Sequence, residues 1–578
     1  MDATKTSEFV IARGVSVAGS GGTQEIKDIG CLGVVAKIWD DLGFTKLFDS
    51  QIEVKEEVQL SPGLVLKAMV LNIIGGRDPL YRVQDWAEMV PLDLVVGKGV
   101  RAEQLNDTTL ARNLDRLFEA GGEGVFNTAC MRVIEKEGID TGQVHADTTS
   151  RLVFGEYLHE EDETISIRRG HSKDKRPDLK QVMYGLTVSK DGVPLTGQLL
   201  SGNTSDKKWH GGMLDVVNQL LVVDRKKSVH YVGDSALITS TNLDLAAQHG
   251  IVLTARIPRN LTLSRETVAR ALAEPLTMQP LGTFAERKDA TSYEGCVVEK
   301  CTLLGHQVQV GVFRPTPSNE LAKDKVSRRQ RRALEEAKQE ALKLTKKKFA
   351  CEADARSSLL AFEGKHKNRL LCIKGDLASE TIEGKKPQGR PRKDATEAPT
   401  TTQHCVTLTV EADDAGRQAV IDEESIFVLA HTGTNSLGPK EMLAAYKEQI
   451  VVETRFPFLK DPAWAEVFFI KTPHRLEALG YVLLLALLVW CVWERRVRAN
   501  LKASGESPLI DTTKMPKKNP TAMVCRHIMA RVKLTRQRTE DDSAPWQLAG
   551  ALTAEQLRVV RFSATPPGSR PEKKPGVR

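Results

Sequence analysis

The spacing of hydrophobic and polar positions changes along the chain, and its first part is typical of helices. Residues 1–135 carry apolar side chains at intervals of three and four positions. The clearest case is 106–118, where Leu110, Leu114 and Leu117 follow a polar start. That spacing places the three leucines on one face of a helix. We therefore expect a mainly helical N-terminal domain over 1–135.

From Gly142 onward the apolar residues form short β-rich runs. Helical stretches near 213–222 and 242–248 interrupt them. The runs cover 144–146, 182–188, 193–200, 229–232 and 251–257. Three strands, a helix, a strand, a helix and a strand are the order expected of a mixed sheet flanked by helices. The pattern therefore predicts an α/β fold for this part of the chain.

Beyond Pro258 the pattern becomes heterogeneous. Strand-like runs lie near 295–313 and 404–430. Between them, 319–349 alternates acidic and basic residues around a narrow apolar stripe, which predicts an exposed charged helix. Residues 384–402 are rich in Pro, Lys, Arg and Thr, the composition of a flexible linker. A helix is predicted to begin again at Pro439, because proline is favoured in a first helical turn.

One apolar run raises the question of a membrane. Leu479 to Trp493 is almost wholly apolar and is followed by Glu494, Arg495 and Arg496. A bilayer requires about 20 such residues, so a buried core helix is favoured over a membrane span. The first residues lack the pattern of a signal peptide. We therefore expect a cytoplasmic protein with no membrane partner.

Charge and cysteine content narrow the function further. The net charge is +7, and Lys and Arg concentrate in a few segments: 323–348, 385–393, 495–502 and 514–538. Such clustering favours a polyanionic partner, and DNA is the first candidate. The nine cysteines form no C-x-x-C pair, so neither a disulfide framework nor a zinc site is predicted.

Two aspartates follow predicted strands directly. Asp147 closes the run that begins at Val144, and Asp234 closes the run that begins at His230. Carboxylates at the ends of adjacent strands can share Mg²⁺, which activates water and neutralises the charge of a scissile phosphate. The alternative is that each aspartate only caps the turn that follows it.

A third acid, Glu453, lies in a polar stripe near the end of the chain. Tyr446, Gln449, Glu453 and Lys460 are spaced so that one continuous helix would align them on a single face. The alternative is a solvated helix face without chemistry. Pro457 would clash with the carbonyl of Glu453 in a straight helix, so a kink or a helix end is predicted there.

Together these residues resemble the bacterial insertion-sequence transposases of the "insertion sequence four" group and its close relatives. The family signature around the glutamate is Y-x2-R-x3-E-x6-K; Tyr446, Glu453 and Lys460 match it, and Gln449 replaces the arginine. Further similar blocks occur in the family's order at 145–157, 170–181, 202–206 and 231–235. The resemblance covers roughly residues 100–500.

The resemblance implies an RNase H-like (retroviral-integrase) α/β catalytic core, interrupted by a β-rich insertion domain and preceded by the helical domain. The implied boundaries are 1–135 for a helical domain that could bind DNA ends, 136–257 and 438–503 for the core, 258–437 for the insertion, and 504–578 for a basic C-terminal tail whose last fifteen or so residues are disordered. Asp147 and Asp234 would share one Mg²⁺ and Glu453 would hold a second, with Mn²⁺ as a substitute. Tyr446, Gln449 and Lys460 would contact DNA.

The implied activity is cleavage at the ends of an insertion sequence, followed by strand transfer into target DNA. Double-stranded DNA would be the partner, a homodimer would form the synapse, and the protein would work at the bacterial nucleoid. Two alternatives stay open: a nuclease of the same fold that cuts without joining, and an inactive DNA-binding relative.

Additional basic residues are weaker candidates for DNA contacts. Lys173, Arg176 and Lys180 would grip phosphates beside the active site, or they form an exposed loop. Arg390 and Arg392 lie in a Gly-Arg-Pro-Arg-Lys motif that resembles a minor-groove AT-hook, although a plain linker has the same composition. His145 and His171 are expected to be structural, because Mg²⁺ prefers oxygen ligands.

Overall fold

The computed structural model describes residues 24–566 except 55–56, 77, 155–156, 158–163, 171–175, 222–227, 274–276, 285–289, 317–319, 384–399, 462–471 and 538–543. The chain divides into two compact units. Unit 1 comprises residues 1–255 and 445–578, and unit 2 comprises residues 256–444. The insertion expected at 258–437 thus falls within unit 2.

Unit 1 begins with a short strand, β1 (Gln24–Asp28), and continues as a group of helices. The helices are α1 (Leu32–Leu42), α2 (Phe44–Gln51), α3 (Pro62–Leu71), α4 (Val83–Met89), α5 (Leu92–Val95), α6 (Asp107–Glu119) and α7 (Gly122–Glu137). Asn106 caps α6 by accepting a hydrogen bond from Thr109 N at 3.0 Å, and Leu110, Leu114 and Leu117 are buried. The periodicity of 106–118 therefore predicted this helix correctly.

The mixed sheet of unit 1 confirms the five predicted strands. They are β2 (Gln143–Val153), β3 (Lys180–Ser189), β4 (Pro194–Ser201), β5 (His230–Gly233) and β6 (Val252–Arg256). Their order in the sheet is β4-β3-β2-β5-β6. β2 pairs antiparallel with β3 and parallel with β5. The helices α8 (Asp206–Leu221) and α9 (Ser240–His249) occupy the connections, as the sequence pattern indicated.

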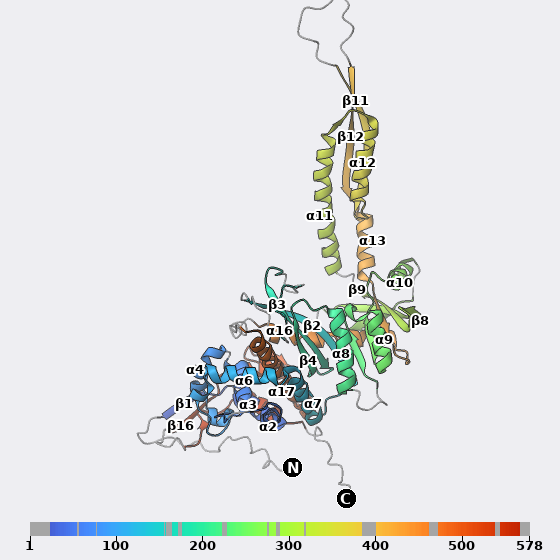
Figure 1. Ribbon diagram of the computed structural model, residues 1–578. Coiled ribbons are helices and arrows are strands. Elements are labelled where there is room, and N and C mark those ends of the chain that lie inside the picture. The colour runs from blue at the N-terminus through green and yellow to red at the C-terminus, as the bar shows by residue number, and fades with distance from the viewer. Residues whose placement is uncertain are drawn as a thin grey trace, which may run out of the picture. The chain divides into compact units, whose positions relative to one another are not determined.

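The apolar run 479–493 forms the middle of a long helix, α17 (Pro473–Ser504), that crosses unit 1 (Figure 1). It packs against α1, α3, α6, α7 and β4. By length and composition α17 could span a membrane, but 94% of its most apolar window is buried inside the protein. The helix is longer than the predicted apolar run because it continues into mainly polar residues on both sides of that run.

The segment after 504 was expected to be a basic tail, and this expectation was wrong for most of its length. It contains β14 (Leu509–Ile510), β15 (Pro516–Lys517), α18 (Ala522–Met529), β16 (Lys533–Gln537), β17 (Gln547–Leu548) and α19 (Ala554–Phe562). β16 pairs with β1, and Arg536 lies over the Trp546 ring at 4.4 Å. A few widely spaced apolar anchors therefore suffice to fold a segment of basic composition. Residues 567–578, expected to be disordered, lie outside the described residues.

Unit 2 contains its own strands and a long helical hairpin arm. The strands β7 (Gln279–Thr283), β8 (Ser292–Leu303), β9 (His306–Thr316) and β13 (Phe427–His431) lie in the order β13-β9-β8-β7. The helix α10 (Thr262–Ala273) precedes them. The arm comprises α11 (Glu320–Thr345), β10 (Lys348–Phe349), α12 (Glu352–His366), β11 (Leu371–Glu383), β12 (Thr400–Ala412) and α13 (Asp414–Ser425).

Within the arm, α11 and α12 flank the paired β11 and β12 (Figure 1). Their core comprises Ala337, Ala341, Phe362, Leu371 and Val410. The charged helix expected at 319–349 is confirmed by α11. The strand-like run at 404–430 was only partly right, because Asp413 caps a helix there by accepting a hydrogen bond from Gly416 N at 2.7 Å.

Candidate active site

Asp147 and Asp234 occupy equivalent positions on adjacent parallel strands of unit 1. The pairs that join β2 to β5 are Gln143↔His230, Val144↔Tyr231 and His145↔Val232. Each aspartate follows the last of these pairs by two residues. Adjacent strands are about 4.8 Å apart. The two aspartates therefore lie next to each other where β5 ends. The prediction that Asp147 closes its strand was wrong, because β2 continues to Val153 through its pairing with β3.

Local hydrogen bonds orient both aspartates. Asp147 Oδ1 accepts a hydrogen bond from Thr148 N at 2.7 Å. Asp234 Oδ1 accepts one from Ala236 N at 2.9 Å, so Asp234 does cap the turn after β5. Its side chain nevertheless remains 45% exposed. The capping role is therefore real and is compatible with a further role at the exposed side.

A buried tyrosine lies near both carboxylates. The Tyr231 hydroxyl is 3.0 Å from His210 Nδ1, and His210 Nε2 is 3.4 Å from Asp234 Oδ1. Burial raises the pKa of Tyr231 well above its usual value, and the negative charges of Asp234 and Asp147 raise it further. The charges of both aspartates thus affect the pKa of the same tyrosine hydroxyl. Sequence reasoning did not identify His210, whose position in α8 gives no separate signal.

Glu453 lies on a series of three short helices rather than one. They are α14 (Pro439–Lys447), α15 (Ile450–Glu453) and α16 (Phe456–Lys460). The joints contain tight bonds to the third preceding residue, from Gln449 N to Tyr446 O at 3.1 Å and from Arg455 N to Val452 O at 3.0 Å. A break near Pro457 was predicted and is confirmed, since α15 ends at Glu453.

The expected single face of four polar residues was wrong, because the tight joints rotate the side chains. Gln449 is 7% exposed, whereas Glu453 is exposed and Tyr446 and Lys460 are half-buried. Gln449 Nε2 donates a hydrogen bond to Ala146 O at 2.8 Å. This bond holds α15 against β2, which favours a structural role for Gln449 over a contact with DNA.

The segment that carries Glu453 runs along the face of β2 that carries Asp147. Alternate residues of a strand share one face, so Gln143, Asp147 and Arg151 point the same way. Gln143 Nε2 donates to Glu448 Oε2 at 2.9 Å, and Arg151 Nη1 donates to the carbonyl of Leu459. Asp147 lies between these two contacts on β2, as Glu453 lies between them on the facing segment.

His145 lies on the same face of β2 and is buried, which fits the structural role expected for it. Its side chain is fully buried, and its Nε2 lies 3.1 Å from Gln143 Nε2 and 4.0 Å from Glu448 Oε2. Burial lowers the pKa of His145 to about 4, so the imidazole is neutral at pH 7. His171 lies outside the described residues.

The oxygen chemistry of Asp147 and Asp234 suits Mg²⁺, and their strand positions would let them hold it jointly. Among the residues that the structure describes, however, no three His, Cys, Asp or Glu side chains come together closely enough to hold a metal ion. Binding of a divalent cation by the two aspartates, with Glu453 as a third ligand, therefore stays a prediction.

The other predicted DNA contacts have varied surroundings. Lys180 Nζ donates to Tyr157 O at 2.9 Å. Arg176 is exposed and forms a two-pronged pair with Asp178, with distances of 2.8 and 2.6 Å. Lys173, Arg390 and Arg392 lie outside the described residues. The DNA-binding roles of all five residues stay predictions.

Comparisons with known proteins match parts of this architecture. A family described as a domain of unknown function, DUF4277, matches residues 24–131, the helical part of unit 1. No curated protein matches the chain. One solved structure, titled "Cryo-EM structure of piggyBac transposase synaptic complex with hairpin DNA", is similar over 95% of this chain and 86% of its own, with 9% sequence identity and a TM-score of 0.36. At that TM-score the likeness supports no conclusion about fold or function.

Proposed function

We propose that this chain is a DNA transposase of the DDE type, with Asp147, Asp234 and Glu453 as its catalytic acids on an RNase H-like core. The observation that carries the proposal is the position of Asp147 and Asp234, each two residues beyond His145↔Val232, the last pair that joins the parallel strands β2 and β5. The packing of α15 on the Asp147 face of β2 supports the assignment of Glu453. The matched N-terminal family is one commonly found in transposases, which supports the same function.

The chemistry proposed is hydrolysis of a DNA phosphodiester followed by attack of the freed 3′-hydroxyl on target DNA. Bound Mg²⁺ would supply charge neutralisation at the phosphate and a more acidic water. Asp147 and Asp234 would hold it, and the hydrogen bonds from Thr148 N and Ala236 N would keep their carboxylates oriented. The Gln449 bond to Ala146 O would keep Glu453 beside the same strand. A homodimeric synapse on two DNA ends is part of the proposal.

The decisive test compares cleavage of DNA that carries the flanking element ends by the wild type and by Asp147→Asn, Asp234→Asn and Glu453→Gln. These changes remove one charge each and preserve side-chain size. We expect each variant to lose about 10³-fold or more in cleavage rate with Mg²⁺, because bound metal lowers the activation barrier by several kcal/mol. Glu135→Gln, an exposed acid on α7, is the matched control and should cleave like the wild type.

The same assay separates the alternatives. Equal cleavage by the wild type and all three variants would refute the assigned roles. Pre-cleaved DNA ends offered with a target plasmid test joining directly: cleavage without joined product would identify a nuclease. Binding of DNA by the wild type with neither cleavage nor joining would identify an inactive relative. Tryptophan fluorescence of each variant checks that unit 1 is folded.

A further inference from the structure

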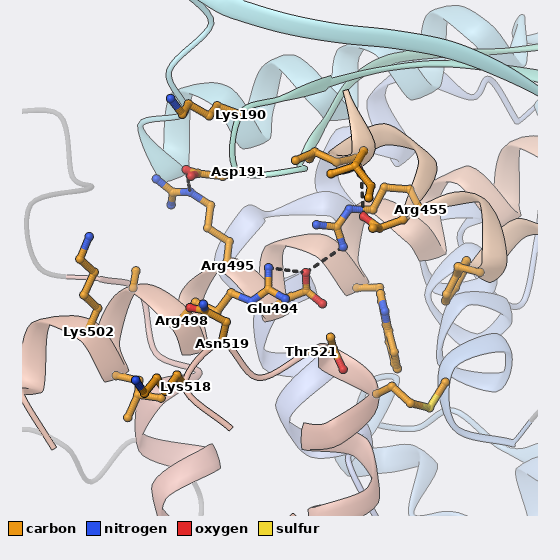
Figure 2. Close-up of a pocket in the computed structure, with 18 of the residues that line it drawn as sticks. Lys190, Asp191, Arg455, Glu494, Arg495, Arg498, Lys502, Lys518, Asn519 and Thr521 are labelled. Carbon is orange, nitrogen blue, oxygen red and sulfur yellow. Dashed lines mark hydrogen bonds and ion pairs between the residues drawn. The ribbon is translucent and has the colours of Figure 1, made fainter. Parts of the chain in front are cut away.

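A large cavity of about 1100 Å³ lies within unit 1, behind the segment that carries Glu453. Its walls come from the turn between β3 and β4, from α15 and α16, from the second half of α17, and from residues 505–523. Figure 2 shows Lys190 and Asp191 on one side of the cavity, and Lys502 and Lys518 on another. Val451 and Thr454 line it and flank Glu453 in sequence.

Two of the acids that line this cavity, the buried Glu494 and the exposed Asp191, pair with arginines. Glu494 is 4% exposed and pairs with Arg455 at 2.8 Å and with Arg498 at 2.9 Å. Its second oxygen accepts a hydrogen bond from Ala522 N at 3.0 Å, at the start of α18. Asp191 pairs with Arg495 at 3.2 Å. Neither Glu494 nor Asp191 therefore needs a further cation, and their charges do not compensate the remaining lysines.

Two lysines of the cavity carry charge without a partner. Lys502 and Lys518 are both exposed, and within the part of the chain that the structure describes neither forms a hydrogen bond or an ion pair. Lys190 adds a third ammonium group, which forms an ion pair with Glu448 at 2.9 Å. Asn519 offers an amide donor beside Lys518. The cations lie on separate elements, which suits a chain of phosphates better than one small anion.

The wall of the cavity is held rigidly in place. Gly192, in the turn between β3 and β4, has a φ of 76°, and a Cβ there would lie 2.2 Å from Arg455 Nη2. The guanidinium of Arg455 thus packs directly on this turn while it binds Glu494 of α17. Arg455 Nε is buried and has no hydrogen-bond partner. The turn that carries Lys190 and Asp191 is therefore packed against Arg455, which is in turn bound to α17.

We propose that this cavity binds the sugar-phosphate backbone of DNA as the DNA passes the candidate active site, with Lys502 and Lys518 as the main contacts. The inference rests on the proposed function for the identity of the polyanion. It adds a binding surface made by α17 and the folded segment after it. The cavity residues on α17 and on the segment after it lie outside the signature around Glu453.

The test measures binding of a fluorescein-labelled DNA duplex by fluorescence anisotropy in EDTA, over a series of salt concentrations. Lys502→Ala/Lys518→Ala should weaken binding on the order of tenfold and lower the slope of log K against log salt by about 2, because each lost phosphate contact removes about 0.9. Lys46→Ala/Lys98→Ala removes the same charge from exposed lysines of unit 1 that lie outside the cavity. It should leave the slope nearly unchanged.

The outcomes separate this inference from the proposed function. An unchanged slope in Lys502→Ala/Lys518→Ala, with DNA bound by the wild type, overturns the cavity as a DNA site and leaves the transposase proposal standing. No DNA binding by the wild type overturns both. Displacement of the duplex by inorganic phosphate at constant ionic strength would identify a small-anion site and overturn the inference.

Discussion

The longest helices of the two units, α17 of unit 1 and α11 of unit 2, differ in how much of their surface is buried. α17 is buried over most of its length, including every residue from Ala478 to Glu494. In α11, which alternates Lys, Arg and Glu, the buried side chains among those described are Ala322, Val326, Gln330, Ala337 and Ala341. A helix with a long apolar middle forms the centre of one unit, and a charged helix lies at the surface of the other.

The two helices accommodate their charged side chains differently. On α17, Arg496 is 1% exposed and pairs with the equally buried Glu137 at 2.7 Å and with Asp41 at 3.0 Å. On α11, Arg329 and Glu340 are 55% and 40% exposed and pair with Glu424 and Lys365. Water solvates the second set whether or not the pairs form. It does not reach the first set, so each buried charge depends on its partner.

The largest expected effect comes from breaking the buried set. Arg496→Met removes the closer of the two arginines that face the buried Glu137 and leaves only Arg495 at 3.7 Å. We expect unit 1 to lose about 3–5 kcal/mol of unfolding free energy. All seven tryptophans lie in residues 1–255 and 445–578, so tryptophan fluorescence in urea follows unit 1 specifically. Replacing both partners with apolar residues, Arg496→Met with Glu137→Leu, should recover most of the loss. A single variant as stable as the wild type would show that water enters this pair.

The two helices also show what the sequence could predict. Continuous apolar runs and regular alternation of charge are local properties, and they predicted α17, α11 and the five strands of unit 1. The end of β5 is local as well and was predicted at Asp234, whereas β2 continues past Asp147 because it pairs with the distant strand β3. Where the prediction was correct, the physical cause lies within about ten residues of the feature.

Features that depend on distant partners were missed. β1 pairs Gln24 with Gln537, so neither segment alone indicates a strand. The tight joints around α15 accompany contacts of Gln449 with Ala146 and of Arg455 with Glu494, which the helical spacing does not contain. Arg455, for which no prediction was made from the sequence, is buried at the cavity. The sequence therefore predicted where Glu453 and its polar neighbours lie in the chain, but not the directions in which their side chains point.

A smaller effect is expected at the start of α17, where Glu477 is half-buried. Its Oε2 accepts a hydrogen bond from Ile165 N at 3.0 Å. Burial raises the pKa of Glu477, and the nearby charge of Glu123 adds to the increase. The folded state therefore holds this proton more tightly than the unfolded state, and the ionised carboxylate lowers stability as the pH rises above the usual value for glutamate.

Glu477→Gln keeps an acceptor for Ile165 N and removes the charge. We expect the variant to be more stable than the wild type at pH 7, by less than the loss in Arg496→Met, and this advantage should shrink as the pH falls toward 4. Urea unfolding followed by tryptophan fluorescence at several pH values measures the difference. A constant difference at all pH values would indicate a packing effect and contradict the electrostatic explanation.

The smallest effect is expected on α11, at Glu340. Hydrogen bonds from Lys365 and His366, at 2.5 and 2.9 Å, lower its pKa to about 2, yet the group is fully solvated. Screening by water and salt leaves exposed pairs with little net contribution. Glu340→Gln should therefore leave the far-UV circular dichroism unfolding curve, which reports both units, unchanged at pH 7. Ala337→Glu, three residues away and fully buried in the arm's core, should shift that curve strongly while the fluorescence curve of unit 1 stays in place. If Glu340→Gln destabilised the arm as much as Ala337→Glu, surface pairing rather than the narrow apolar stripe would hold α11.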